Sequence, residues 1–439
     1  MKRSFDFSSQ QAGRGTPDYS FGVGSKVYLY GTGQRRLQVR TVTALTEPGR
    51  ILCGASSEEL GVTYLFMLDG RGVIDESFGE AGVAIFKLSE LFYEWGLALP
   101  YSVKFDISLR KYVMGFFVQK EGVNRASGLA RFELNGQLDV SFGNKGVMIW
   151  SPDMQDVAPE SSALQEAKST LTARGRDYHG AMELMGDGGV LLLTSLDNNG
   201  LFDLAYVVKV KNDGALNEEF GNDGWLRIVK EGANLAVTGE DLVRQGDNYL
   251  VAASAGIHDK SWFVGRYDAQ GDVDYSFGIN GYYEGLPSVK NLILKRDDRS
   301  QFYLAGTSDN GVPQYLFLQL QRRGINGEED PHFGSQGWTA AISADFNDIH
   351  VLKAALYNSA STIVLAGLAD LRREEGSQAF IASIEQDMGW DEAFGDEGKV
   401  LLPKGEVIHD LVLQEDRKIV FISSVQGAPD SFAIVRLNG

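Results

Sequence analysis

The stretch Leu134-Asn-Gly-Gln-Leu-Asp-Val-Ser-Phe-Gly-Asn-Lys-Gly146 decides the fold, because its central part recurs along the whole chain. The recurring unit is an Asp or Asn, two further residues and a Phe-Gly pair. Its copies are Asp18-Tyr-Ser-Phe21-Gly22, Asp75-Glu-Ser-Phe78-Gly79, Asp139-Val-Ser-Phe142-Gly143, Asn217-Glu-Glu-Phe220-Gly221, Asp274-Tyr-Ser-Phe277-Gly278, Asp330-Pro-His-Phe333-Gly334 and Asp391-Glu-Ala-Phe394-Gly395. Such self-similarity across 439 residues indicates one repeat architecture rather than several unrelated domains.

The sequence between the copies has the pattern of β-strands. Successive repeat Phe residues are separated by 57, 64, 78, 57, 56 and 61 positions, which leaves room for four strands in each interval. Segments rich in β-branched residues flank short polar turns, as at 410–413 and 418–422, and a further strand is expected after each Phe-Gly turn. We therefore predict an all-β, seven-bladed β-propeller with four-stranded antiparallel blades.

The pattern predicts that the two ends of the chain share one repeat. The last copy stops at Arg436-Leu437-Asn438-Gly439, and Thr16-Pro17-Asp18 is the expected continuation; joining Gly439 to Thr16 reproduces the interval from Gly136 to Asp139. We predict that an N-terminal outer strand at 26–30 joins three C-terminal strands and closes the ring, because closure hides exposed sheet edges. The domains are then an N-terminal extension, 1–15, and a single propeller, 16–439.

The pattern Leu-Asn-Gly-x-Leu-Asp-x-Ser-Phe-Gly-x-x-Gly resembles the delta-60 repeat of bacterial β-propeller proteins, and the resemblance spans essentially the whole chain. It implies the fold but no common activity. Two copies depart from the pattern, with extra residues at 324–327 in the sixth and one residue fewer at Gly389-Trp-Asp391 in the seventh. Both departures fall in a turn, where the fold tolerates them.

Composition excludes several classes of partner. A net charge of −18 opposes nucleic acid, which binds clustered Lys and Arg, and also opposes anionic membranes. The first residues lack the apolar stretch of a signal peptide, and no apolar run approaches the roughly 20 residues that span a bilayer. We expect a soluble monomer, either cytoplasmic or exported without a leader. Cys53 lies in an apolar run, which predicts a buried thiol rather than a reactive one.

The repeated Asp and Asn residues have two interpretations. The oxygen-rich segment 212–224 could bind calcium, but its spacing does not match an EF-hand loop. The favoured interpretation is structural: Asp and Asn bond their own backbone in tight turns, Gly supplies positive φ, and the Phe packs into the core. We also find no local motif of a nucleophile elbow, a zinc protease or a phosphate-binding loop. The sequence predicts no cofactor, no metal site and no catalytic residue.

The strands that follow the outer strands should line the central channel. Alignment of the hairpins places one set of residues just ahead of these strands, at the channel mouth, with His179 aligned only to within one position. The set is Arg40, Tyr101, His179, Glu240, Lys290, His350 and His409. This ring could bind a small ligand or a partner's side chain, although channel mouths are polar for solvation alone.

The longest interval carries an insertion at about 151–178 on the same face. Ser162-Ala-Leu-Gln165 is a capping-box pattern and Gly175 suits a helix end, so a helix is expected near 163–174. Long loops on rigid scaffolds often carry binding residues, though many are neutral insertions. The charged loops at 258–260 and 372–375 should share this face and are typical of solvated loop tips.

These observations favour a non-enzymatic binding module or scaffold that holds a protein or peptide at the channel-mouth face. A hydrolase or lyase with its active site at the channel mouth is the first alternative. Glycan binding between blades is the second, for which exposed Trp residues would be expected. Trp225 and Trp338 directly follow the second Gly of their repeats, where packing within a blade is the favoured role.

Overall fold

The computed structural model describes residues 13–30, 36–45, 49–92, 96–120, 123–152, 180–198, 202–230, 236–256, 261–284, 293–296, 301–308, 317–334, 338–341, 346–356, 362–371, 377–385 and 390–439. Within them, the strands form five four-stranded sheets and one eight-stranded sheet. The eight-stranded sheet consists of two four-stranded runs joined by a single parallel bridge, Leu204 to Val237. The expected all-β fold of four-stranded antiparallel sheets is confirmed.

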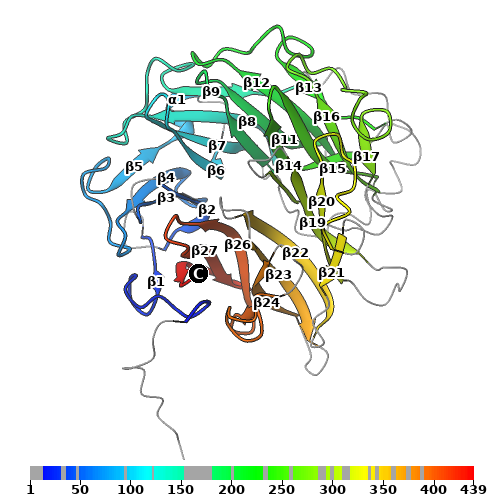
Figure 1. The fold of residues 1–439 in the computed structure, drawn as a ribbon. Helices are drawn as coiled ribbons and strands as arrows, with labels where there is room; N and C mark the ends of the chain where they lie inside the picture. The colour runs from blue at the N-terminus through cyan, green and yellow to red at the C-terminus, as the bar shows by residue number, and fades with distance from the viewer. Residues whose placement is uncertain are drawn as a thin grey trace, which may run out of the picture.

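Each four-stranded unit has an inner, a second, a third and an outer strand. The inner strands are β2 (Gln38–Ala44), β6 (Ala98–Asp106), β10 (Gly180–Leu184), β14 (Val237–Gln245), β18 (Ile293–Arg296), β22 (Phe346–Leu356) and β26 (Glu406–Leu413). The second strands are β3 (Ile51–Ser57), β7 (Lys111–Lys120), β11 (Val190–Asn198), β15 (Asn248–Ala255), β19 (Phe302–Ser308), β23 (Thr362–Leu371) and β27 (Ile419–Val425). In Figure 1, β2, β6, β14, β22 and β26 lie toward the middle of the molecule.

The remaining strands lie farther out. The third strands are β4 (Val62–Leu68), β8 (Val123–Phe132), β12 (Phe202–Val210), β16 (Ser261–Tyr267), β20 (Phe317–Arg323), β24 (Ser377–Glu385) and β28 (Ala428–Leu437). The outer strands are β5 (Val83–Phe86), β9 (Val147–Trp150), β13 (Trp225–Arg227), β17 (Tyr282–Glu284), β21 (Trp338–Ala341), β25 (Lys399–Leu401) and β1 (Lys26–Val27). The described residues include one short helix, α1 (Leu88–Leu91).

The hydrophobic core lies between neighbouring sheets. Buried side chains of β3 and β4, for example, pack in one cluster with those of β27 and β28. The repeat Phe residues belong to these clusters, and each of them is at most 1% exposed. Facing sheets therefore bury each other's apolar side chains, which is why each unit needs a neighbour on both sides.

The Phe-Gly turns have the structural role that the sequence favoured. In the turn after β8, the Ser141 hydroxyl donates to Asp139 at 2.6 Å, and Arg131 Nε donates to the other carboxylate oxygen at 2.8 Å. The Arg131 guanidinium also lies over the Phe142 ring, 4.6 Å from its centroid. The same Arg, Asp and Phe arrangement occurs with Arg436, Asp18 and Phe21, with Arg266, Asp274 and Phe277, and with Arg322, Asp330 and Phe333.

Within the described residues, six of the Phe-Gly turns are also bonded, through the Gly amide, to the neighbouring turn of the next repeat. The Gly143 amide donates to the Asp213 carbonyl at 2.7 Å, and Gly79 donates to Asn135 at the same distance. Gly143 has a φ of 52°, and a Cβ at this position would lie 2.4 Å from the Val147 carbonyl oxygen. Glycine is therefore required by both backbone conformation and close packing.

The two ends of the chain meet in one sheet, whose strand order is β1, β28, β27, β26. Lys26 pairs with Val435 and Val27 with Ile434, and Figure 1 shows the C-terminus beside β1. Along the chain, each inner strand contacts the next inner strand, and β26 contacts β2.

The glycine that completes the terminal turn is Gly15, not Gly439 as the sequence predicted. Gly15 has a φ of 77° and donates to the Asn438 carbonyl at 2.6 Å, as Gly136 does to Glu133 within an unbroken repeat. The Gly395 amide donates to the Arg14 carbonyl at 2.9 Å. Arg14 and Gly15, which the sequence assigned to the N-terminal extension, thus contribute to the folded unit.

Candidate functional site

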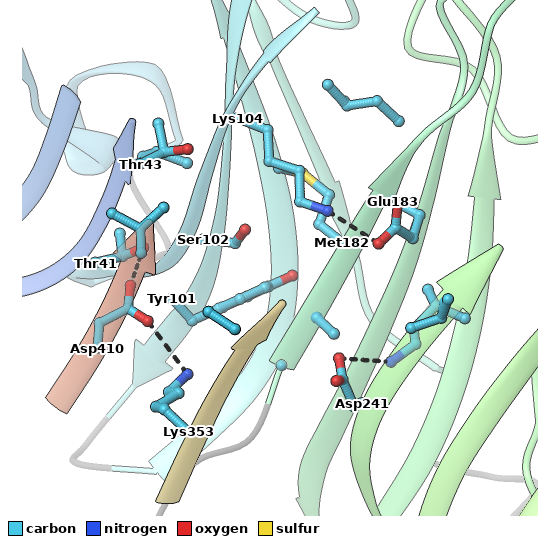
Figure 2. A pocket seen from close by; sticks show the side chains of 18 of the residues that line it. Thr41, Thr43, Tyr101, Ser102, Lys104, Met182, Glu183, Asp241, Lys353 and Asp410 are labelled. Atoms are coloured by element: carbon cyan, nitrogen blue, oxygen red, sulfur yellow. Dashed lines mark hydrogen bonds and ion pairs between the residues drawn. The ribbon is translucent and has the colours of Figure 1, made fainter. Parts of the chain in front are cut away.

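The inner strands surround a cavity of about 860 Å³. Residues of β2, β6, β10, β14, β22 and β26 line it, and in β2, β14, β22 and β26 they come from the second half of the strand. Figure 2 shows the polar side chains that project into it: Thr41, Thr43, Tyr101, Ser102, Lys104, Glu183, Asp241, Lys353 and Asp410. A polar, partly open cavity enclosed by rigid strands is the candidate functional site of this molecule.

A β-bulge in the inner strands decides which side chains enter the cavity. The pairing of β2 with β3 shifts between Val39 and Thr41, so that Arg40 is the extra residue. Corresponding shifts make Tyr101, Glu240 and His409 the extra residues of β6, β14 and β26. In β2, β14 and β26, the residue after the bulge lines the cavity: Thr41, Asp241 and Asp410. A bulge re-aims the side chains around it, which explains this placement.

The side chains at these bulges hold neighbouring strands together. Arg40 Nε donates to the Ser56 hydroxyl at 2.8 Å, and His409 Nε2 lies 2.7 Å from the Ser424 hydroxyl. The Ser254 hydroxyl donates to Glu240 at 3.4 Å. Three residues predicted to form a channel-mouth ring thus contact a serine on the second strand of their own sheet.

Tyr101 both lines the cavity and packs against its own sheet. Its hydroxyl lies 3.4 Å from that of Ser127, and its ring centroid lies 4.6 Å from that of Phe117. Burial raises the pKa of the Tyr101 phenol, so the hydroxyl stays protonated at neutral pH.

The other predicted ring residues are placed differently. His350 lies two residues before Leu352, which is the extra residue at the second bulge of β22, so it does not occupy the position of Arg40 or His409. His179 and Lys290 lie outside the described residues, as do the expected helix at 163–174 and the charged loops at 258–260 and 372–375.

Two pairs of charged groups in the cavity join neighbouring sheets. Lys353 Nζ of β22 lies 3.5 Å from Asp410 of β26, and Lys104 Nζ of β6 donates to Glu183 of β10 at 3.0 Å. Dashed lines mark both pairs in Figure 2. The lining therefore presents ammonium and carboxylate groups together, a combination that suits polar or charged ligands.

Asp410 is the most firmly held of these groups. One carboxylate oxygen accepts from the Thr41 hydroxyl at 3.0 Å and from the Val42 amide at 2.9 Å, and the other accepts from the Leu411 amide at 3.0 Å. The bonds to Thr41 and Val42 join β26 to β2. The carboxylate thus fixes the arrangement of two sheets at the cavity wall.

Cys53 lies behind this wall and does not enter the site. Its side chain is fully buried, and burial together with the nearby Asp410 charge raises the pKa of the thiol. The predicted burial of this thiol is confirmed.

The residues that follow the bulges were not predicted from the sequence, because a bulge leaves no recognised pattern in an inner strand of this kind.

Three side chains of the segment considered for calcium accept hydrogen bonds from the protein itself. Asp213 accepts from the Ala215 amide, Asn217 from the Glu219 amide, and Asn212 from Arg131. Across the described part of the chain, His, Cys, Asp and Glu side chains form no group of three that could hold a metal ion. No helix in this same part is long and apolar enough to cross a membrane.

Comparison with known proteins supports the fold. A family model described as a β-propeller domain of unknown function (DUF5122) matches residues 112–142, and with the four-stranded sheets it identifies a β-propeller fold. No curated protein matches the chain. The delta-60 character of the repeat is not part of this match.

Solved structures similar to this chain have diverse descriptions. Drosophila Semaphorin 2a is 8% identical with a TM-score of 0.49, and the match covers 99% of this chain and 77% of that one. The β-propeller domain of the Trilobed protease from Pyrococcus furiosus is 8% identical with a TM-score of 0.46, over 92% and 93%. The polysaccharide lyase Uly1 is 10% identical with a TM-score of 0.44, over 98% of both chains. Likenesses this distant assign no function.

Proposed function

We propose that the chain closes into a seven-bladed propeller of the delta-60 type. The eight-stranded sheet then counts as two blades, because one bridge joins its halves. Support for closure comes from the pairing of β1 with β28 and from the contact between β26 and β2. A Phe-Gly turn in every repeat supports the count of seven.

Within this scaffold we propose a non-enzymatic binding module that holds a protein or peptide partner. The partner would place an acidic side chain or its C-terminal carboxylate in the central cavity. The observation that carries this proposal is the position of Lys353, whose side chain is 42% exposed at the cavity wall and lies beside Asp410. An ammonium group has three donors, so it can contact Asp410 and a ligand carboxylate together.

Asp410 orients the ammonium group of Lys353 and does not itself contact the ligand. Its oxygens already accept bonds from Thr41, Val42 and Leu411, and its side chain is only 14% exposed. A carboxylate held in this way orients the ammonium before a ligand arrives, which lowers the entropic cost of binding. Lys104, held by Glu183 on another side of the cavity, offers a second ammonium group.

The channel-mouth residues remain the proposed rim of this site: Arg40, Tyr101, His179, Glu240, Lys290, His350 and His409. The bonds from Arg40, Glu240 and His409 to serines would keep the rim rigid. The net charge of −18 repels an acidic partner at long range, but physiological salt screens that repulsion beyond about 8 Å. Local contacts with Lys353 and Lys104 then decide affinity.

A hydrolase or lyase remains the competing function. General acid and base catalysis commonly uses His, and the described lining of the cavity contains none. Its carboxylates at Asp410 and Glu183 are both paired with lysines. These observations favour binding over catalysis.

The test is selection from a library of random hexapeptides with free C-termini, followed by fluorescence anisotropy. Selected peptides should be rich in Asp and Glu or should require the free carboxylate. Lys353→Met should raise their Kd at least tenfold, on the order of 1.4 kcal/mol. Lys211→Met, in an exposed turn outside the cavity, should leave the Kd unchanged.

Two results would overturn the proposal. One is a folded Lys353→Met variant, checked by thermal unfolding, that binds the selected peptides as tightly as the unmodified protein. The other is cleavage of the peptides during incubation, detected by mass spectrometry and abolished in the same variant, which would favour the hydrolase.

A further inference from the structure

A second cavity of about 1080 Å³ lies beside the outer strand β17 and shares no lining residue with the central cavity. Figure 1 shows β17 at the outside of the molecule. The lining consists of Lys230, Gly278, Ile279, Asn280, Tyr282, Tyr283, Glu284, Asn326, Gly327 and Glu328. These residues come from three consecutive four-stranded units, so the cavity is a groove that extends to both sides of β17.

Two consecutive tyrosines of β17 line the groove, one on each face of this strand, because successive side chains of a strand project to opposite faces. Tyr283 is held by a hydrogen bond to Gln321 at 2.7 Å and by the Arg323 guanidinium, 4.0 Å from the ring centroid. The Tyr282 ring meets Phe263 edge-on at 5.8 Å, and its hydroxyl donates to the Val229 carbonyl at 3.4 Å. Both rings are partly exposed yet fixed, as preorganised contact surfaces require.

This aromatic pair is specific to one repeat. The outer strands begin with the same two positions after the second Gly of their turns, or after Ser25 in the first copy. The described equivalents are Lys26-Val27, Val83-Ala84, Val147-Met148, Trp225-Leu226, Trp338-Thr339 and Lys399-Val400, and none is aromatic at both positions. Trp225 packs against Trp150 of the preceding sheet and Tyr206 of its own, at centroid distances of 5.8 and 5.7 Å, so it contributes to packing between two sheets rather than within one blade. An aromatic residue at the first position thus has a packing role, but the fold does not require aromatic residues at both positions.

Polar groups of both signs surround the two rings. Lys230 Nζ lies 3.3 Å from Glu284, whose side chain is 66% exposed. Asn280, Asn326 and Glu328 add amide and carboxylate groups on the other side. The groove thus offers hydrogen-bond donors and acceptors beside each tyrosine ring without an excess of positive charge.

We propose that this groove binds a neutral oligosaccharide. Sugar rings present apolar C–H faces that pack on tyrosine rings, and hydroxyl groups that need both donors and acceptors when they leave water. The paired Lys230 and Glu284 supply both, whereas a sulfated or uronic-acid glycan would meet Glu284, Glu328 and a protein of net charge −18. This site is independent of the central cavity and of its proposed function.

The experiment is saturation-transfer NMR and calorimetry with neutral tetrasaccharides of glucose, xylose, mannose and N-acetylglucosamine. At least one should bind with a Kd of about 1 mM or tighter. Tyr282→Ala should raise that Kd at least tenfold, and Tyr282→Phe, which keeps the ring, should change it less than threefold. Tyr275→Ala is the matched control, because Tyr275 is 75% exposed on the preceding turn and does not line the groove.

Thermal unfolding of each variant separates loss of binding from loss of folding. Glu284→Gln, at a second and exposed position of the groove, should also weaken binding. The proposal fails if no tetrasaccharide binds the unmodified protein. It also fails if folded Tyr282→Ala and Glu284→Gln bind normally, or if Tyr275→Ala weakens binding as much as they do.

Discussion

The amide nitrogen of Gly395 donates a hydrogen bond of 2.9 Å to the carbonyl oxygen of Arg14, which joins the seventh Phe-Gly turn to the N-terminal segment. The same bond links Gly79 to Asn135 and Gly143 to Asp213 inside the chain. A contact that elsewhere joins consecutive repeats thus joins residues from opposite ends of the sequence.

Arg14 should contribute to stability through this junction. Its guanidinium lies 2.6 Å from Asp391, whose side chain is 3% exposed. Arg14→Ala leaves that carboxylate without its cation and should lower the free energy of unfolding by about 1 to 3 kcal/mol. Arg71→Ala, at the equivalent turn position but paired with Asp69 in an exposed site, should cost less than about 0.5 kcal/mol. Urea titration measures both, and equal losses would contradict the assigned role of Arg14.

Acid should destabilise the protein through the repeat carboxylates. Burial alone would raise the pKa of Asp18, Asp139 and Asp274, but hydrogen bonds from the following Ser and a neighbouring Arg outweigh it and lower the pKa. A carboxyl with a lowered folded pKa stabilises the fold above its unfolded pKa, and that contribution is lost as pH falls through the folded value.

We therefore expect the free energy of unfolding to fall as pH drops below about 4. Asp139→Asn should destabilise the protein at pH 7. It should also reduce the slope of the acid limb, which is the fall of the free energy of unfolding below about pH 4. Asp247→Asn, whose side chain is 96% exposed, should leave the limb unchanged. Urea titrations between pH 7 and pH 3 give the comparison, and parallel acid limbs in all three proteins would refute the assignment.

Replacement by alanine should destabilise the protein more at the glycines of the Phe-Gly turns than at other glycines with positive φ. A Cβ on Gly79 would lie 2.1 Å from the Val83 carbonyl oxygen, whereas none of the described atoms lies within 4 Å of a Cβ on Gly24. Both have positive φ. Gly24→Ala should cost about 1 kcal/mol for backbone strain, and Gly79→Ala clearly more because backbone must move. Equal losses of stability would show that the turn is less tightly packed.

Cys53 should be protected from modification in the native state. Its side chain is fully buried, and burial and the Asp410 charge raise its thiol pKa. A thiol reagent at neutral pH should therefore not react with the folded protein, yet should label the single Cys after denaturation. Labelling of the native protein at the rate of a free cysteine peptide would contradict this burial.

Much of the fold could be predicted because it depends on local turn chemistry. The Asp-x-x-Phe-Gly copies carry their own backbone bonds, positive-φ glycines and buried Phe residues within a few positions. The terminal turn was harder to predict, because Gly15 stands three positions before Asp18 and Gly439 does so as well when it is joined to Thr16. Only the pairing of Gly15 with Asn438 distinguishes them.

The candidate site was less predictable than the fold. Alignment located the bulge residues Arg40, Tyr101, Glu240 and His409, but a bulge turns the following side chain toward the cavity. In β22 the extra residue at the bulge is Leu352, two positions after His350. The alignment therefore selected His350 and missed Lys353, which follows the bulge. An extra residue in one strand shifts every later side chain, and a sequence pattern alone does not reveal it.

The N-terminal strand β1 completes the sheet formed by the C-terminal strands β26, β27 and β28. Lys26 and Val435 are direct partners in this sheet, so cysteines at both positions, in a Cys53→Ser background, have the separation that a disulfide needs. Mild oxidation should give a monomeric, intramolecular crosslink that migrates faster than the reduced protein on a denaturing gel. A Lys26 and Ile85 cysteine pair, on different sheets, should not crosslink. Absence of the first crosslink, or its formation only between molecules, would contradict closure.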